Sequence, residues 1–187
     1  MGTRGLYGFR KNGIDKLTYN HWDSYPDCLG EHIVEFCKNI SIKEMNEIFD
    51  KIILVNESKE PTEEQINECM EFYDGSVSTG SVREWYCLLR ETQGSLYPYK
   101  RGLKYMIDSH EFIKDSLFCE YAYIINLDTN CLEFYVGFQK EPCKSNRYGV
   151  EDDRGYYPCK MVAYYALDDQ RLVQEIIDDM NVMSKQN

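Results

Sequence analysis

Residues 119–138 read CEYAYIINLDTNCLEFYVGF, and this stretch decides the fold. Its two halves, residues 119–127 and 131–138, are rich in Tyr, Ile, Leu and Phe, which fit the pleated, half-buried surface of a sheet. Asp128, Thr129 and Asn130 lie between the halves and are typical turn residues. The stretch therefore predicts a β-hairpin, and the apolar run at residues 159–167 predicts a further strand after it.

The N-terminus predicts a second hairpin. Residues 3–10 alternate in polarity and contain aromatic residues, and residues 14–21 resume the same extended pattern. The Asn12-Gly13 pair between them tolerates the positive φ angles that a tight hairpin turn needs. Gly5 and Gly8 are unusual inside a strand, because glycine weakens a strand unless the backbone bends or closely approaches another group.

Helical spacing fills the middle of the chain. Apolar residues recur at this spacing over residues 29–37, and after Ser41 they continue as far as Ile53. A hydroxyl residue is followed three positions later by Glu or Gln at three helix starts, and each pair predicts a capping box: Ser41 with Glu44, Thr62 with Gln65, and Ser81 with Glu84. Shorter helices are expected at residues 101–107 and 111–117.

The C-terminal strand leads into Asp168 and Asp169, which are expected to cap a closing helix. The polar, glycine-containing residues 140–155 are expected to form an exposed loop. Strands at both ends and helices between them predict one α+β domain over residues 1–187. We expect a mostly antiparallel sheet of about five strands, made of the N-terminal hairpin and the C-terminal strands, packed with a central helical block and a C-terminal helix.

The charge balance limits the classes of function. The 187 residues contain 21 Lys and Arg against 32 Asp and Glu, a net charge of −11, which disfavours a protein that coats nucleic acid. Residues 97–105 interleave tyrosines with bases, yet the patch is short, so tyrosine packing explains it better than direct nucleic-acid binding. No apolar stretch is long enough for a membrane span, and no signal peptide is evident, so a cytoplasmic protein without a membrane partner is expected.

Eight cysteines are scattered through apolar patterns, without any C-x-x-C pair, and are expected to be reduced thiols that act as small hydrophobic residues. Only three histidines accompany them, so neither a metal site nor a cofactor is predicted. The phosphate-binding patterns GxxxxGK[ST] and GxGxxG and the hydrolase pattern GxSxG are also missing from the sequence.

The densest cluster of reactive side chains lies at residues 19–32, where a strand leaves the predicted sheet. His21 and Asp23 point to the same side of a strand, so Asp23 could orient His21 as a general base. Cys28 and His32 lie four apart and could form a thiolate and its partner at a helix start. The alternative is purely structural, with acids that cap the helix and a Tyr25-Pro26 turn that packs.

Arg4 and Tyr25 are candidate binding residues beside this cluster. An arginine there could hold a carboxylate or phosphate with two hydrogen bonds, or could form an ordinary surface ion pair.

Residues 31–75 contain twelve acids and four lysines, a net charge of −8. This acidic block is either a solvated helical face or a surface for a basic partner. Its candidate binding residues are Glu44, Glu47, Asp50, Glu63, Glu64 and Glu68.

Three segments resemble a family of small, largely uncharacterised proteins from phages, gut bacteria and fungi: Met1-Gly2-Thr3-Arg4-Gly5, residues 19–30 with Asp23-Ser24-Tyr25-Pro26 at their centre, and the hairpin of residues 120–138. Residues 159–169 are similar as well. The family has no established activity, so the resemblance implies no functional residue.

The resemblance and the acidic block together favour a non-enzymatic binding protein of phage or mobile-element origin. It would inhibit or modulate a host protein, for example one of a defence system such as CRISPR, through its acidic surface. That surface would suit a partner with a basic nucleic-acid-binding surface. The alternative is a small hydrolase or ligand-binding enzyme with its site at the exit of the N-terminal hairpin.

Overall fold

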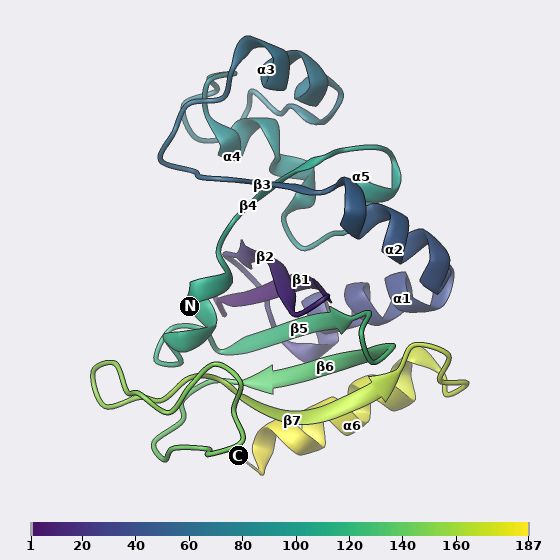
Figure 1. Cartoon of the computed structure of the whole chain (residues 1–187), viewed down its shortest axis with the longest axis vertical. Coiled ribbons are helices and arrows are strands. Elements are labelled where there is room, and N and C mark those ends of the chain that lie inside the picture. Colours follow the sequence, from purple (N-terminus) through teal and green to yellow (C-terminus); the bar gives the residue numbers. More distant parts are fainter. Residues whose placement is uncertain (1, 187) are drawn as a thin grey trace.

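A twisted five-stranded sheet is the centre of the structure, a computed structural model that describes residues 2–186. Its strand order is β2-β1-β5-β6-β7, and Figure 1 shows the strands following one another along the long axis of the molecule. Within this sheet only the β1–β5 pair is parallel. The bounds are Gly5–Lys11 (β1), Ile14–Asn20 (β2), Tyr121–Asn126 (β5), Cys131–Val136 (β6) and Lys160–Ala166 (β7).

Both predicted hairpins are confirmed. Lys11 faces Ile14 across the first turn, where Asn12 and Gly13 adopt φ angles of 53° and 72°. In the second hairpin Asn126 faces Cys131, and β5 pairs with β1, so the two ends of the chain share one sheet as expected. The α+β fold with a mostly antiparallel sheet is therefore confirmed.

Helices fill the segment between the hairpins and close the chain. Figure 1 shows α3 and α4 beyond the β2 edge of the sheet and α6 beside β7, at the opposite end of the molecule. The bounds are Glu31–Asn39 (α1), Ile42–Lys51 (α2), Glu63–Cys69 (α3), Trp85–Leu88 (α4), Tyr97–Lys100 (α5) and Val173–Lys185 (α6). A single π-helical turn, Pro26–Gly30, precedes α1.

Two of the three predicted capping boxes form. The Ser41 hydroxyl accepts from the Glu44 amide at 3.2 Å, and the Glu44 carboxylate accepts from the Ser41 amide at 3.0 Å. Thr62 and Gln65 repeat this exchange at the start of α3. Each box satisfies amides that the first turn of a helix leaves free.

The third predicted box is wrong. The Glu84 carboxylate accepts instead from the hydroxyls of Ser78 and Thr79, at 2.7 and 2.6 Å. The Ser81 hydroxyl accepts from the Arg83 amide, so Ser81 closes a turn and α4 begins only at Trp85. Upstream hydroxyls thus compete for the carboxylate that the box would need.

The predicted caps of the closing helix are also wrong. Asp169 accepts from the Arg171 amide at 2.8 Å, and Leu172 is the residue before α6. The Leu172 amide donates to Glu175 at 2.6 Å, so the helix start is satisfied by a carboxylate inside its first turn.

Two predicted helical segments contain strands. Residues 105–107 form β4, which pairs in parallel with β3 at Ile53–Val55, so Ile53 is a strand residue and not the end of α2. In place of the helix expected at residues 111–117, His110–Lys114 form a short 3-10 helix. Short apolar runs fit both helix and strand, and here tertiary pairing decides.

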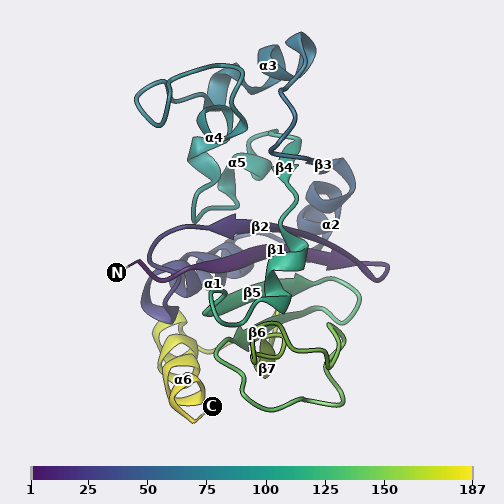
Figure 2. The same cartoon turned by 90° about the vertical axis from the view of Figure 1, so that its left-hand side faces the viewer.

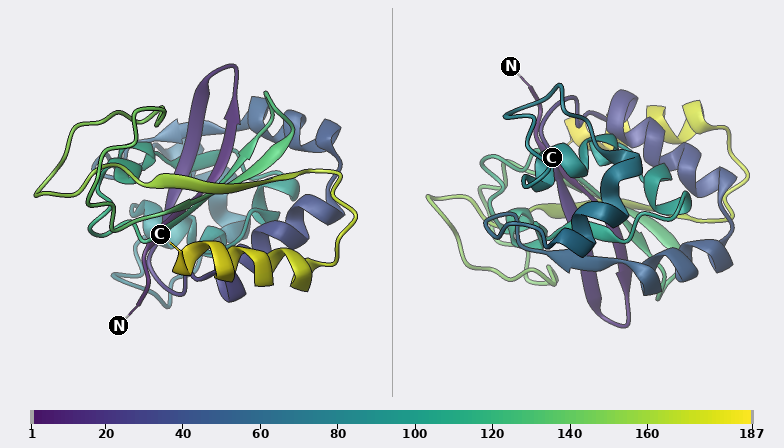
Figure 3. Two further views of the ribbon diagram at one scale, coloured as in Figure 1. Left: turned by 90° about the horizontal axis from the view of Figure 1, so that it is seen from below. Right: turned by 90° about the horizontal axis from the view of Figure 1, so that it is seen from above.

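The inner strands β1, β5 and β6 are buried on both faces, whereas most residues of β7 are partly or fully exposed. Figure 2 shows α1 and α6 on one side of the sheet, while the loops after β4 and β6 lie on the other. Alternate residues of β1 therefore enter different cores: Tyr7 and Phe9 pack with the helices, and Leu6 packs with Ile113 and Cys119. Figure 3 shows that the β1–β2 hairpin crosses β7, as strong twist requires.

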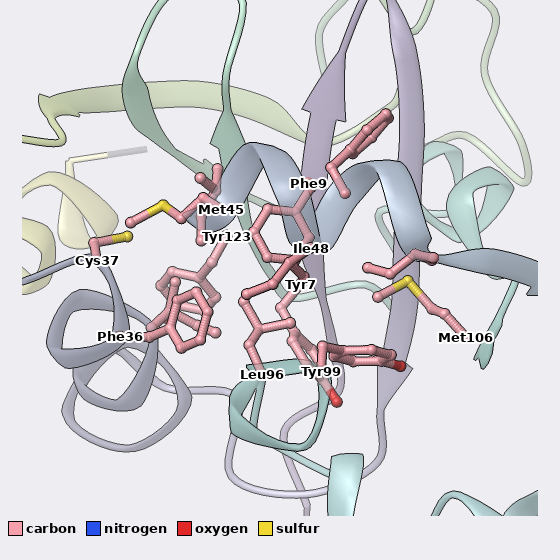
Figure 4. Close-up of a cluster of buried hydrophobic side chains, with 14 of the residues drawn as sticks. Tyr7, Phe9, Phe36, Cys37, Met45, Ile48, Leu96, Tyr99, Met106 and Tyr123 are labelled. Carbon is pink, nitrogen blue, oxygen red and sulfur yellow. The ribbon is translucent and has the colours of Figure 1, made fainter. Parts of the chain in front are cut away.

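The larger core connects the sheet to the helical block. Figure 4 shows Tyr7 and Phe9 among Phe36, Leu96 and Tyr99, side chains that come from α1, α5 and the segment before α5. Burial of such large rings against helices from the middle of the chain holds the block on the sheet.

Residues 140–155 are mostly exposed, as predicted for this loop. All eight cysteines are free thiols, and five of them are buried, as predicted. None of the helices within residues 2–186 is long and apolar enough to cross a membrane.

Candidate functional site

Hydrogen bonds to the N-terminal segment, β2 and β5 fix the exit of the N-terminal hairpin. The Ser24 amide donates to the Thr3 carbonyl at 3.2 Å, and the Asn20 amide group donates to the Ser24 hydroxyl at 2.8 Å. Tyr123 from β5 donates to the Ser24 carbonyl at 3.0 Å. Asp23 has a φ angle of 52°, a conformation that aspartate tolerates better than most residues, and it redirects the chain into the π-helical turn.

A cleft of about 410 Å³ opens at this exit, and we call it the hairpin-exit cleft. Three of the four sequence-selected residues of the cluster line it, and the exposed Trp22 ring lies among them. Its lining includes Trp22, Asp23, Asp27, Cys28, His32 and Arg90.

His21 lies outside the hairpin-exit cleft. Its Nδ1 atom lies 2.9 Å from the Tyr19 hydroxyl, and its ring packs against Trp22 with 4.3 Å between centroids. It lines a separate cleft of about 210 Å³ with Tyr86. Within residues 2–186 no hydrogen bond joins His21 to Asp23, because β2 ends at Asn20 and the alternation of a strand does not reach Asp23.

His32 is oriented by the backbone of a distant segment. Its Nδ1 atom lies 3.3 Å from the Gly94 carbonyl, and a carbonyl only accepts, so Nδ1 carries a proton in this contact. In the neutral ring Nε2 is then a hydrogen-bond acceptor.

Cys28 lacks the properties of a thiolate nucleophile. Burial raises the pKa of its thiol, and the nearby carboxylates of Asp23, Asp27 and Glu31 raise it further. A reactive cysteine needs the opposite shift, since the thiolate is the nucleophile. No hydrogen bond between Cys28 and His32 is present among the described residues, so the predicted nucleophile and base are not paired.

Arg90 is a charged residue of this cleft that the sequence did not reveal. It begins a short 3-10 turn, Arg90–Thr92, after α4, and no acid in residues 2–186 forms an ion pair with it. The buried Tyr7 hydroxyl donates to the Thr92 carbonyl and accepts from the Gly94 amide at 3.2 Å. These bonds hold the segment from Arg90 to Gly94 against the sheet, beside the hairpin exit.

Most carboxylates of the acidic block have cationic partners within the chain. Five of the six selected acids form such pairs: Glu44 with Lys100, Glu47 with Lys43, Asp50 with Lys11, Glu63 with Arg83, and Glu68 with Lys104. Among the described residues only Glu64 of the six lacks an ion pair. The six acids also lie on two separate helices, α2 and α3 (Figure 1).

Arg4 and Tyr25 line another cleft, of about 290 Å³. We call it the aromatic cleft, and its lining includes Thr3, Arg4, Tyr25, Phe118, Glu120 and Phe138. The predicted binding residues therefore divide between this cleft and the six acids of α2 and α3.

In the part of the chain that the structure describes, no three His, Cys, Asp or Glu side chains are grouped so as to hold a metal ion. Comparisons with protein families, with curated proteins and with solved structures find no match to this chain.

Proposed function

We propose that this chain is a non-enzymatic binding protein, and that the hairpin-exit cleft binds a small zwitterionic ligand such as an amino acid or a short peptide. The observation that carries this proposal is that both acidic side chains, Asp23 and Asp27, and a basic one, Arg90, line the same cleft. The cleft volume of about 410 Å³ falls within the range of small-molecule sites.

The charges of the cleft are available to a ligand. Neither Asp23 nor Arg90 has an ion-pair partner within residues 2–186, whereas most other arginines of the chain do. The carboxylate would accept from a ligand ammonium group, and the guanidinium would hold a ligand carboxylate with two hydrogen bonds. Trp22, with 57% of its surface exposed, adds an apolar wall that also attracts cations.

Binding is better supported than catalysis. A small hydrolase needs a nucleophile within hydrogen-bond reach of a base, and neither Cys28 with His32 nor His21 with Asp23 supplies such a pair in the described residues. The acidic block is a weaker basis for binding than the cleft, because its selected carboxylates are mostly paired already. A phage origin and a host-protein partner stay predictions from the sequence resemblance.

Isothermal titration calorimetry with amino acids and dipeptides tests the proposal. N-acetylated and C-amidated derivatives, which lack one charge each, should bind at least tenfold more weakly, as should the variants Asp23→Asn and Arg90→Gln. Arg83→Gln is the matched control, because Arg83 is an exposed arginine paired with Glu63 outside the cleft.

Two results would contradict the proposal. One is an Arg90→Gln protein that binds the same ligand as tightly as the natural chain. The other is turnover of a peptide or ester that disappears in Cys28→Ser or His32→Gln, since that result would show an enzyme.

A further inference from the structure

The aromatic cleft gathers three exposed rings from separate parts of the chain. Tyr25 follows the first hairpin, Phe118 precedes β5, and Phe138 follows β6, with exposed fractions of 44%, 38% and 51%. Single exposed rings are ordinary on a protein surface, whereas rings grouped around one concavity mark an interaction site. Such a grouping offers flat faces on which a planar ligand can stack.

The backbone holds Phe138 in a strained conformation at this cleft. Its φ angle is 56°, which bulky residues rarely adopt, and its amide donates to the Ser116 carbonyl at 2.7 Å. The neighbouring Gly137 amide donates to the Glu120 carbonyl at 2.8 Å, and a Cβ atom on Gly137 would lie 2.1 Å from the Cys119 carbonyl. In this strained conformation the Phe138 ring lines the cleft and stays half exposed. Strained backbone conformations of this kind are frequent at binding sites.

Arg4 supplies a positive charge that no ion pair neutralises among the described residues. Its guanidinium lies 5.3 Å from the centroid of Phe118, and no ion pair joins it to an acid within residues 2–186. Arg154 lies 5.1 Å from the same ring but is paired with Asp115 at 2.7 Å. Of these two arginines, Arg4 is thus the one free to bind an anion, and its planar fork suits a phosphate.

Glu120 adds a hydrogen-bond acceptor. One of its carboxylate oxygens lies 3.4 Å from the Arg4 amide, and no cation pairs with this carboxylate among the described residues. A ligand that is only anionic would be repelled by Glu120. A ligand that also carries N–H donors would be attracted, because an ionised carboxylate accepts through both of its oxygens.

We propose that the aromatic cleft binds a single guanine nucleotide. The base stacks among Tyr25, Phe118 and Phe138, its adjacent N–H groups donate to Glu120, and its phosphate binds Arg4. The cleft volume of about 290 Å³ is at the small end of ligand sites, which suits one nucleotide. The net charge of −11 disfavours a long nucleic-acid strand. This site is independent of the hairpin-exit cleft.

Titration calorimetry on the full chain tests the proposal with GMP, AMP, guanosine and inorganic phosphate. We expect GMP to bind at least tenfold more tightly than each of the other three. Arg4→Gln should bind GMP only as tightly as the natural chain binds guanosine, and Glu120→Gln should lose the preference for GMP over AMP. Phe138→Ala should lower the affinity for both guanosine and GMP, because it removes part of the stacking surface.

Arg171→Gln is the matched control, since Arg171 also lies over a ring, Tyr165 at 5.4 Å, but is paired with Asp169 away from the cleft. Its GMP affinity should equal that of the natural chain, and circular dichroism checks that each variant folds. A 5′-phosphorylated oligonucleotide that begins with guanosine would make the same contacts through its first nucleotide. Tighter binding of this oligonucleotide than of GMP would support the site and would identify the end of a strand as its ligand. Equal affinity for GMP and phosphate, or no GMP binding at millimolar concentration, would overturn the proposal.

Discussion

Arg147 forms a bidentate ion pair with Glu133, a carboxylate buried in the middle of β6. Its Nη1 atom lies 3.0 Å from Oε1 of Glu133, and Nη2 contacts the other oxygen. Asn126 and Tyr135 also donate to this carboxylate, at 2.7 and 3.0 Å. The pair attaches the exposed loop of residues 140–155 to the face of the sheet opposite α1 and α6.

Arg147→Met should lower the free energy of unfolding by about 3–5 kcal/mol, because it leaves the Glu133 carboxylate buried without a cation. Urea denaturation at pH 7 measures the change. Arg154→Met is the control in the same loop. Its exposed ion pairs with Asp115 and Asp153 should contribute less than about 1 kcal/mol. An equal effect of both variants would show that Glu133 does not depend on Arg147.

Gly8→Ala should destabilise the N-terminal hairpin. Gly8 has a φ angle of 148°, and a Cβ atom there would lie 2.2 Å from the Lys16 carbonyl, so both the backbone and the β1–β2 pairing would have to shift. We expect a loss of about 2 kcal/mol or more in the free energy of unfolding.

Gly149→Ala separates the effect of the positive φ angle from the effect of the close contact with the Lys16 carbonyl. Gly149 also has a positive φ angle, 103°, but no atom lies within 4 Å of its added Cβ. Gly149→Ala should therefore lower the free energy of unfolding less than Gly8→Ala does in the same thermal or urea unfolding experiment. A larger loss at Gly149 would assign the effect to the φ angle and remove the role of the Lys16 contact.

Local patterns predicted the parts of the fold that depend on neighbouring residues. The hairpins follow from alternation and from turn residues such as Asn12 and Gly13, and the capping box at Ser41 needs only Glu44. The box at Ser81 fails for an equally physical reason, since Ser78 and Thr79 take the Glu84 carboxylate. A sequence pattern identifies possible partners and does not rank them.

The candidate site depended on contacts that spacing does not encode. Asp23, Cys28 and His32 were found because they lie within ten residues of each other, whereas Arg90 reaches the cleft only through the packing of residues 92–94 on Tyr7. The sequence did contain a signal that Glu133 is buried with a partner, because this charged residue interrupts an otherwise apolar strand.

Acid should destabilise the contact between α2 and α5 through Glu44. The hydrogen bond from Lys100, with those from Ser41, lowers the pKa of Glu44 from its usual 4.5 to about 2. The folded pKa is below the unfolded one, so the stabilisation is present above pH 4.5 and is lost as pH falls towards 2. Glu44→Gln should therefore be less stable than the natural chain at pH 7 and should lose less stability between pH 4.5 and pH 2.

Urea midpoints at several pH values between 7 and 2 measure this difference. Glu64→Gln is the control on the acidic block, because Glu64 has no ion pair within the described residues. Parallel curves for Glu44→Gln and the natural chain would mean that Glu44 has its ordinary pKa in the folded protein.

Cys143 should react with iodoacetamide faster than Cys28. Hydrogen bonds from Ser145 lower the pKa of the Cys143 thiol, whereas burial and three nearby carboxylates raise that of Cys28. Cys37, whose pKa burial raises to about 12, should react only after unfolding. Mass spectrometry of peptides sampled over time at pH 7.5 gives each rate, and Cys143→Ser should lose the fast phase. If Cys28 reacted as fast as Cys143, the thiol in the hairpin-exit cleft would be activated and the nucleophile hypothesis would regain support.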